Sequence, residues 1–190
     1  MAASTNIIDI LEAAPIIAAV RDEAGLAKVL ETPAQVVFLL HSTLTTVKDQ
    51  VARIKAGGKI CFIHLEMIAG LSKDQVALDF LRSEAAPDGI ITTKPNLVQP
   101  AKDLGLYTVQ RLFILDSQSI QTGLKMIQHN HTDLIEIMPG IIPKVVTEIK
   151  KHSRIPVIAG GMINTKEEII ELLKVGVIAV STSDTELWEL

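Results

Sequence analysis

The sequence predicts a compact (β/α)8 barrel preceded by a short N-terminal helix. Eight short and nearly continuous apolar runs recur at the spacing of one βα unit, which favours parallel strands buried on both faces. The segments between them have helical apolar spacing, and no linker or low-complexity tract divides the 190 residues. We therefore expect residues 1–190 to form one domain. A five-stranded doubly wound sheet is the alternative, but it leaves several good strand runs unused.

The predicted strands follow one another along the whole chain. They cover residues 16–20, 36–40, 60–65, 89–92, 107–112, 134–138, 155–159 and 177–181. Typical barrels of this kind have at least ~200 residues. We therefore expect minimal loops here and a last helix reduced to a stub over residues 185–190.

The segments between the strands carry the start and stop signals of helices. An extra helix is predicted over residues 7–12, and apolar residues from Val47 to Ile54 recur at helical spacing before Gly57 ends that helix. Ser72 followed by Gln75 predicts a capping box at the start of another helix.

A second capping box is predicted near the C-terminus. Asn164 followed by Glu167 predicts it before the last full helix, which Gly176 ends.

Composition restricts the class of protein. With 48% hydrophobic and only 3% aromatic residues, the core must be aliphatic, and the net charge of −4 argues against a general nucleic-acid binder while leaving room for a local basic patch. The single Cys61 rules out an internal disulfide framework. The chain has no apolar stretch of ~18 residues, and residues 1–6 lack the Lys or Arg of a secretory signal. We expect a cytoplasmic protein without a membrane partner.

Polar side chains gather at the carboxyl ends of the predicted strands, which meet at one mouth of a barrel. They are Arg21, Asp22, His41, His64, Glu66, Lys94, Arg111 and Glu136. Because a buried strand cannot hold a lone carboxylate cheaply, Glu136 needs a cationic partner or a ligand, and Arg111 on the adjacent strand is the natural candidate. These residues suit a structural ion-pair network or a pocket for a small hydroxylated anion. His41, His64 and Glu66 could also hold a transition metal, although their spacing matches no specific motif.

Two turns near the C-terminus predict a phosphate cradle. Each follows an apolar run: residues 159–162 contain Gly160 and Gly161, and residues 180–183 end in Thr182 and Ser183. Free backbone N–H groups after the last two strands of a barrel characteristically bind phosphate. Plain turn chemistry is the alternative. The chain has no P-loop, no dinucleotide fingerprint and no recognisable nucleophilic triad.

Basic residues form two local groups. Lys144, Lys150, Lys151, His152 and Arg154 lie on or just after one predicted helix, and Lys48, Arg53, Lys55 and Lys59 lie on another. Ordinary solvated helix faces explain such groups as well as a binding surface does.

Several strings resemble the glycerol uptake operon antiterminator family. They are residues 20–22, 64–66, 70–74, 89–94, 110–113, 115–117, 135–140, 159–161, 180–183 and 187–188. Gln-Arg-Leu-Phe at 110–113 and Glu-Ile-Met-Pro-Gly at 136–140 are uncommon strings. The similarity runs from about Pro15 to Trp188. One departure is Glu66, where the family often carries Asp.

The resemblance implies a bacterial regulator on a phosphate-binding barrel. Its effector would be glycerol 3-phosphate, with no other cofactor, and its target would be leader mRNA of glycerol-utilisation transcripts. Phosphate would lie on the N–H groups of Gly160, Gly161, Thr182 and Ser183. The polyol and its charge would face Arg21, His64, Glu66, Lys94, Arg111 and Glu136.

Two other functions remain open from the sequence. One is an enzyme acting on a phosphorylated triose or pentose, with His64 and a carboxylate as the acid–base pair. The other is a ligand-binding module that works through a protein partner. A homo-oligomer is compatible with all three.

Overall fold

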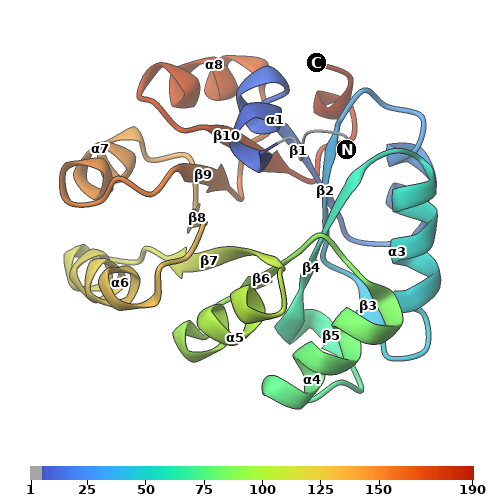
Figure 1. Ribbon diagram of the computed structural model, residues 1–190. Coiled ribbons are helices and arrows are strands. Elements are labelled where there is room, and N and C mark those ends of the chain that lie inside the picture. The colour runs from blue at the N-terminus through green and yellow to red at the C-terminus, as the bar shows by residue number, and fades with distance from the viewer. Residues whose placement is uncertain (1–5) are drawn as a thin grey trace.

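The computed structural model describes residues 6–190, apart from the side chains of residues 129 and 130. Within this part of the chain, eight parallel strands close into a barrel in the order β1-β10-β9-β8-β7-β6-β4-β2, and helices surround it (Figure 1). The strands are β1 (Ile16–Val20), β2 (Val36–Leu39), β4 (Ile60–His64), β6 (Gly89–Thr92), β7 (Tyr107–Phe113), β8 (Leu134–Met138), β9 (Val157–Gly160) and β10 (Ala179–Thr182). The predicted barrel is therefore confirmed.

The helices occupy the connections between strands. They are α1 (Ile7–Ala13), α2 (Glu23–Val29), α3 (Val47–Ala56), α4 (Gln75–Phe80), α5 (Val98–Asp103), α6 (Ser117–Asn130), α7 (Pro143–His152) and α8 (Lys166–Lys174). A π-helical turn (Leu81–Ala85) extends α4, and 3-10 turns cover Leu65–Met67, Pro95–Leu97 and Leu187–Glu189. Among the described residues, none of these helices combines the length and the apolar character needed to cross a membrane.

Some details differ from the sequence prediction. The strand predicted at 155–159 begins at Val157, because Pro156 has no N–H to donate to a ladder. A two-stranded parallel sheet, β3 (Ser42–Thr43) with β5 (Ile68–Ala69), was not predicted. Strands of two residues carry too little alternation to be recognised.

The predicted helix caps are displaced by one or two residues. At α4 the cap is Asp74 rather than Ser72. At α8 the capping box is formed by Thr165 with Glu168, one residue later than the box predicted from Asn164. Asn164 and Thr165 are both good capping residues, so residue preference alone fits either register.

The lower part of the barrel interior is apolar and is closed by α1. Ile7 and Leu11 of that helix are buried against inward side chains from the strands. These are Ile17, Val36, Phe38, Phe62, Ile91, Val109, Leu134, Ile158 and Ala179. A second, larger apolar cluster lies between the strands and the surrounding helices. With the amino end of the barrel plugged, polar side chains are left to the opposite end.

The C-terminal stub fastens the seam between β1 and β10. Its single 3-10 turn contains Trp188, which is 1% exposed and donates its indole N–H to the carbonyl oxygen of Thr182 at 2.8 Å. The predicted stub is therefore present, as one turn rather than a full helix.

We expect Gly89→Ala to lower the free energy of unfolding by about 1–3 kcal/mol, the usual cost of overpacking a core. A Cβ at Gly89 would lie 2.4 Å from the Phe62 ring and 2.7 Å from the Tyr107 carbonyl oxygen. Urea unfolding measures the loss. The double variant with Phe62→Leu should recover part of it, and strictly additive effects would contradict this packing.

Candidate functional site

Three buried polar side chains form a continuous chain at the carboxyl end of the barrel. The Arg111 Nε on β7 donates to Oε2 of Glu136 on β8 at 2.6 Å. The hydroxyl of Ser181 on β10 donates to the other carboxylate oxygen, Oε1, at 2.7 Å. Glu136 is completely buried, and Arg111 and Ser181 are nearly so. The cationic partner predicted for Glu136 is thus present, and both of its oxygens have donors.

Gly160 makes this chain possible. Strand β9 lies between β8 and β10, so the Glu136 carboxylate must reach past it to meet Ser181. A Cβ at position 160 would lie 2.4 Å from Glu136 Oε1 and 2.6 Å from the Ser181 oxygen. A larger residue would break the link, so this glycine is required by the packing.

The turn after β9 has the backbone form expected of an anion cradle. Gly161 has φ +78°, and its amide, like that of Ser183, donates to no acceptor within the described residues. The loop after β8 packs on this turn, because the Gly140 N–H donates to the Gly160 carbonyl oxygen at 2.6 Å. Gly161 and Ser183 are both accessible to solvent.

The side chain of Thr182 has a structural task. Its hydroxyl donates to the Ile163 carbonyl oxygen at 2.9 Å and accepts from the Asp184 N–H at 3.1 Å. It therefore ties the turn after β9 to the turn after β10. Thr182 is one of the four residues predicted to bind phosphate. Because its hydroxyl is used in this way, only its backbone N–H is left for such a ligand.

A second polar group surrounds Glu66, which lies in the 3-10 turn after β4. Its Oε1 accepts from the Thr92 hydroxyl at 2.5 Å and from the Thr93 N–H at 3.3 Å. Its Oε2 lies 3.1 Å from His64 Nδ1. Both atoms are buried and lack any other hydrogen-bond partner among the described residues. Such a pair is suited to receive a hydroxyl group from outside.

The surroundings of Glu66 keep it ionised. Burial by itself would raise the pKa of this carboxyl group, but the His64 ring and the Thr92 hydroxyl favour the charged form. The net effect is a pKa below the ordinary value of 4.5. At neutral pH the group is therefore a hydrogen-bond acceptor.

The remaining predicted residues lie at the rim. The Lys94 ammonium group donates to the Lys73 carbonyl oxygen at 3.0 Å and is thus tied to the loop before α4. Arg21 is exposed and lines a hollow of about 460 Å³ at the seam of β1 and β10, together with Ser183 and Trp188.

The proposed metal ligands do not assemble. Asp22, a residue of the predicted mouth outside that metal set, caps α2 and accepts the Gly25 N–H at 2.7 Å. In the part of the chain that the structure describes, no three His, Cys, Asp or Glu side chains are placed to hold a metal ion, so His41, His64 and Glu66 do not form such a group.

Sequence reasoning missed Ser181 and Thr92 as site residues. Ser181 is a small hydroxyl at an inward position of β10, beside the Gly160 of β9. That juxtaposition is the signal, but it is visible only once the register of the two strands is known. Thr92 ends a strand on the outward face, and only the turn carrying Glu66 brings a carboxylate to it.

We expect Arg111→Met to destabilise the protein by about 3–5 kcal/mol, because it leaves the buried carboxylate of Glu136 without its cation. The double variant Arg111→Met/Glu136→Gln removes the charge and keeps an acceptor for Ser181, so it should recover most of that loss. Urea denaturation of both variants measures the difference. Equal stability of Arg111→Met and the wild type would show that the ion pair is not needed.

A pH series should reveal the contribution of Glu66. Its folded pKa lies below its unfolded value, so the stability that it contributes is present above the unfolded pKa and is lost as pH falls through the folded pKa. The Tm of the wild type should exceed that of Glu66→Gln at pH 7. This gap should close as the pH falls below about 4.5. A gap independent of pH would contradict the shift.

Comparison with known proteins gives the family. The model of the glycerol-3-phosphate responsive antiterminator family matches residues 16–188. The uncharacterised protein YgcP from Escherichia coli K12 is 35% identical over 184 residues, covering 97% of this chain and 96% of that protein. A deoxyribose phosphate aldolase from Aeropyrum pernix, at 12% identity and a TM-score of 0.71 over 94% of this chain and 88% of its own, shares the fold alone.

Two solved structures are more similar. The glycerol uptake operon antiterminator regulatory protein from Listeria monocytogenes has a TM-score of 0.89 at 39% identity, over 92% of this chain and 94% of its own. A glycerol uptake operon antiterminator-related protein from Thermotoga maritima has a TM-score of 0.82 at 37% identity, over 93% and 99%. The chain belongs to the glycerol-3-phosphate responsive antiterminator family.

Proposed function

We propose that this protein binds glycerol 3-phosphate in the barrel mouth and, with the effector bound, acts on the leader mRNA of glycerol-utilisation transcripts in the cytoplasm. The observation that carries the proposal is the Gly160–Gly161 turn beside the Arg111–Glu136–Ser181 chain. The turn that would hold the anion and a fixed set of polar groups lie at the same mouth of the barrel.

The phosphate would lie on the backbone N–H groups of the last two turns. The Gly161 and Ser183 amides have no acceptor among the described residues, and unpaired N–H groups at such turns attract anions. The Gly160 and Thr182 amides would complete the cradle. Arg21 lines the adjoining hollow and would add positive charge.

The glycerol hydroxyls would face the two polar groups of the mouth. His64 Nδ1 and Glu66 Oε2 lack partners in the described part of the chain, so a hydroxyl that donates to Glu66 would satisfy a buried acceptor. Arg111 is held by Glu136 through Nε and also lines a hollow of about 370 Å³ with Thr93. Its guanidinium group therefore retains donors for an oxygen of the ligand.

A link between the effector and the rest of the surface runs through the loop after β8. Gly140 donates to the Gly160 carbonyl oxygen, and a Cβ at Gly140 would lie 2.6 Å from the Gly160 nitrogen. An anion on the neighbouring Gly161 amide would favour one arrangement of this tight contact. The effector can change RNA binding only if its affinity differs between two arrangements of this loop.

Isothermal calorimetry with glycerol 3-phosphate should give one binding site in the wild type and no measurable heat in Gly161→Asp. The aspartate places a carboxylate where the dianion would lie and also meets the Met138 side chain, whose Cε would be 2.8 Å from the added Cβ. Normal binding by the variant would show that the cradle lies elsewhere.

Gly105→Asp is the matched control. Gly105 also has a positive φ, +73°, but it precedes β7 at the opposite end of the barrel, and no described residue other than its chain neighbours comes within 4 Å of an added Cβ. It should bind the effector normally. Incubation of the pure protein with phosphorylated trioses and pentoses tests the phosphosugar-enzyme alternative, in which His64 and a carboxylate such as Glu66 would act as the acid–base pair. Turnover of any of them would favour the enzyme, and their recovery unchanged would favour the regulator.

A further inference from the structure

The two basic groups of the sequence have different surroundings. On and near α3, Lys48, Arg53 and Lys55 each form an ion pair with a carboxylate 2.9–3.1 Å away. Lys59 is buried and donates to two backbone carbonyl oxygens, and burial lowers its pKa. This group is neutralised within the protein and has little charge left for a partner.

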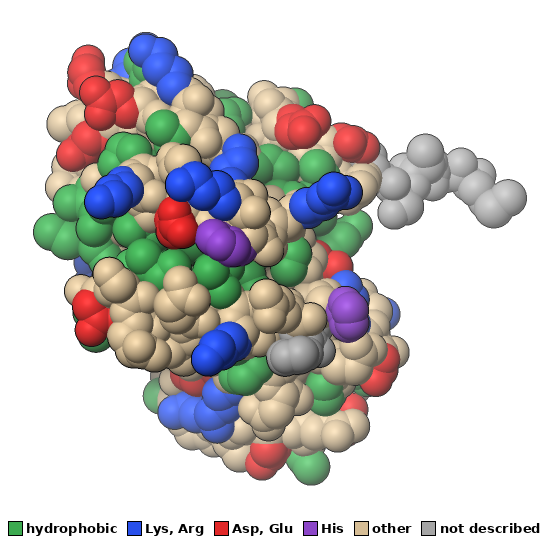
Figure 2. Space-filling model, turned by 90° about the vertical axis from the view of Figure 1, so that its left-hand side faces the viewer, with side chains coloured by type: hydrophobic (Ala, Val, Ile, Leu, Met, Phe, Trp, Pro, Cys, Tyr) green, Lys and Arg blue, Asp and Glu red, His purple; other side chains and the backbone are tan. Residues whose placement is uncertain are grey.

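The group on α7 and the loop after it keeps most of its charge. Lys150 donates to the Gly176 carbonyl oxygen at 2.7 Å, which leaves its charge uncompensated. Arg154 is exposed and, like Lys144, forms no ion pair within the described residues. Lys151 and His152 both lie beside the Glu148 carboxylate, at 3.2 and 3.7 Å. Figure 2 shows this side of the molecule, where Lys and Arg side chains gather around a histidine over the region of α7.

A hollow of about 370 Å³ opens beside this loop, between the end of α6 and the start of β9. Three planar side chains line it: His131, His152 and Arg154. Ile127 and Ile155 also contribute to its wall. Imidazole rings and guanidinium planes are groups on which unstacked RNA bases stack. The combination of planar and apolar walls suits a base, and the charge around it suits the phosphates on either side.

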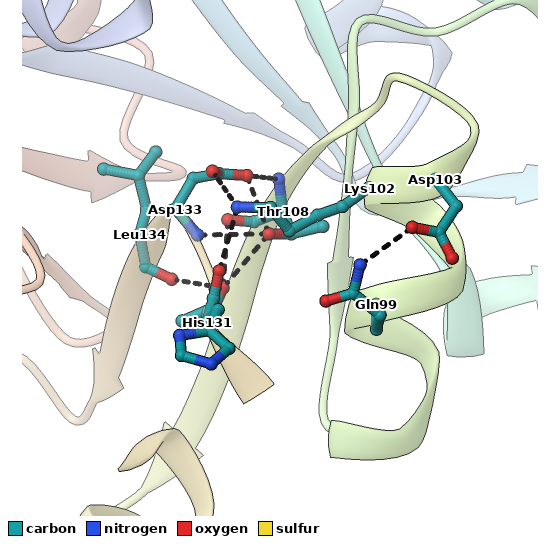
Figure 3. Close-up of polar contacts among 8 residues, drawn as sticks. Gln99, Lys102, Asp103, Thr108, His131, Asp133 and Leu134 are labelled. Carbon is teal, nitrogen blue, oxygen red and sulfur yellow. Dashed lines mark hydrogen bonds and ion pairs between the residues drawn. The ribbon is translucent and has the colours of Figure 1, made fainter. Parts of the chain in front are cut away.

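The backbone of His131 is held firmly by a polar network (Figure 3). Lys102 donates to the His131 carbonyl oxygen at 2.9 Å and to Asp133 at 2.5 Å. Asp133 in turn accepts the Thr108 N–H at 2.9 Å. The imidazole ring points away from this network (Figure 3). The ring therefore takes no part in the hydrogen bonds of this network and faces the hollow's side of the loop.

A second hollow continues on the other side of the same loop. It has a volume of about 690 Å³ and is lined by Lys150, Ser153 and Arg154, with Glu12 at its edge. Arg154 and Ser153 line both hollows. A single strand that places a base between the histidines would cross Arg154 and bring its next phosphate toward Lys150.

We infer that single-stranded RNA binds across this α7–β9 loop, with one unstacked base in the hollow between His131 and His152 and phosphates on Arg154 and Lys150. The inference rests on the proposed function and assigns its RNA contact to the end of the barrel opposite the effector site. Hollows with planar walls favour RNA over a membrane surface, which offers no base to fill them.

Fluorescence anisotropy with a labelled leader RNA of a glycerol-utilisation transcript, at saturating glycerol 3-phosphate, tests this surface. Arg154→Ala should weaken binding about tenfold and reduce the slope of log affinity against log salt by about one. His152→Ala should weaken it about tenfold by removing a stacking plane. His131→Asn should do the same, and Asn tolerates the left-handed conformation, φ +50°, at this position.

Lys48→Ala on α3 is the matched control for loss of one positive charge, and it should bind RNA like the wild type. Calorimetry with glycerol 3-phosphate should be unchanged in all four variants, which reports that the barrel and its mouth are intact.

If the α7–β9 variants bind RNA like the wild type, the surface is wrong while the RNA-binding function stands. If the wild type binds effector but no RNA, the RNA arm of the proposed function fails and this inference fails with it. An acidic peptide with the same net charge as the RNA should not displace it. Displacement by this peptide would show that charge alone is recognised and would overturn the assignment of a base to the hollow.

Discussion

The carboxylate of Glu136 is buried inside a barrel of apolar strands, and the arrangement of the mouth follows from satisfying it. Two oxygens need donors, and no water-filled space is required if neighbouring strands supply them. Arg111 supplies one donor from β7 and Ser181 the other from β10. Because β9 lies between, it must carry no side chain at that level, which makes residue 160 a glycine. Such a buried pair adds little net stability, but it fixes the positions of three strands relative to one another.

Under the proposed function the two ends of the barrel would have different tasks, and two strands join them. β8 begins just after His131 and Asp133 and carries Glu136, and β9 begins just after Arg154 and ends at Gly160. Each therefore leads from the proposed RNA hollow to the effector mouth. A strand in a closed ladder cannot shift alone, since its neighbours hold it on both sides.

The fold and the main ion pair could be predicted because each is indicated by a short stretch of sequence. Continuous apolar runs predict buried parallel strands, and a carboxylate inside such a run predicts a cation nearby, which correctly gave the pairing of Glu136 with Arg111. The contribution of Ser181 could not be predicted in this way, since it depends on two strands that are separated by a third. The commitment of the Thr182 hydroxyl to the Ile163 carbonyl oxygen depends likewise on the path of a loop. The predicted positions of two helix caps were wrong by one or two residues, because nearby residues are equally good caps.

The order of the elements along the chain has one further consequence. The last strand closes the barrel against the first, and the Trp188 indole fastens it there through the Thr182 carbonyl oxygen. Ser181, which completes the donors of Glu136, lies on this same last strand. The buried carboxylate therefore lacks its second donor until β10 has docked between β9 and β1. Closure of the barrel and completion of the polar mouth are consequently one and the same step of folding.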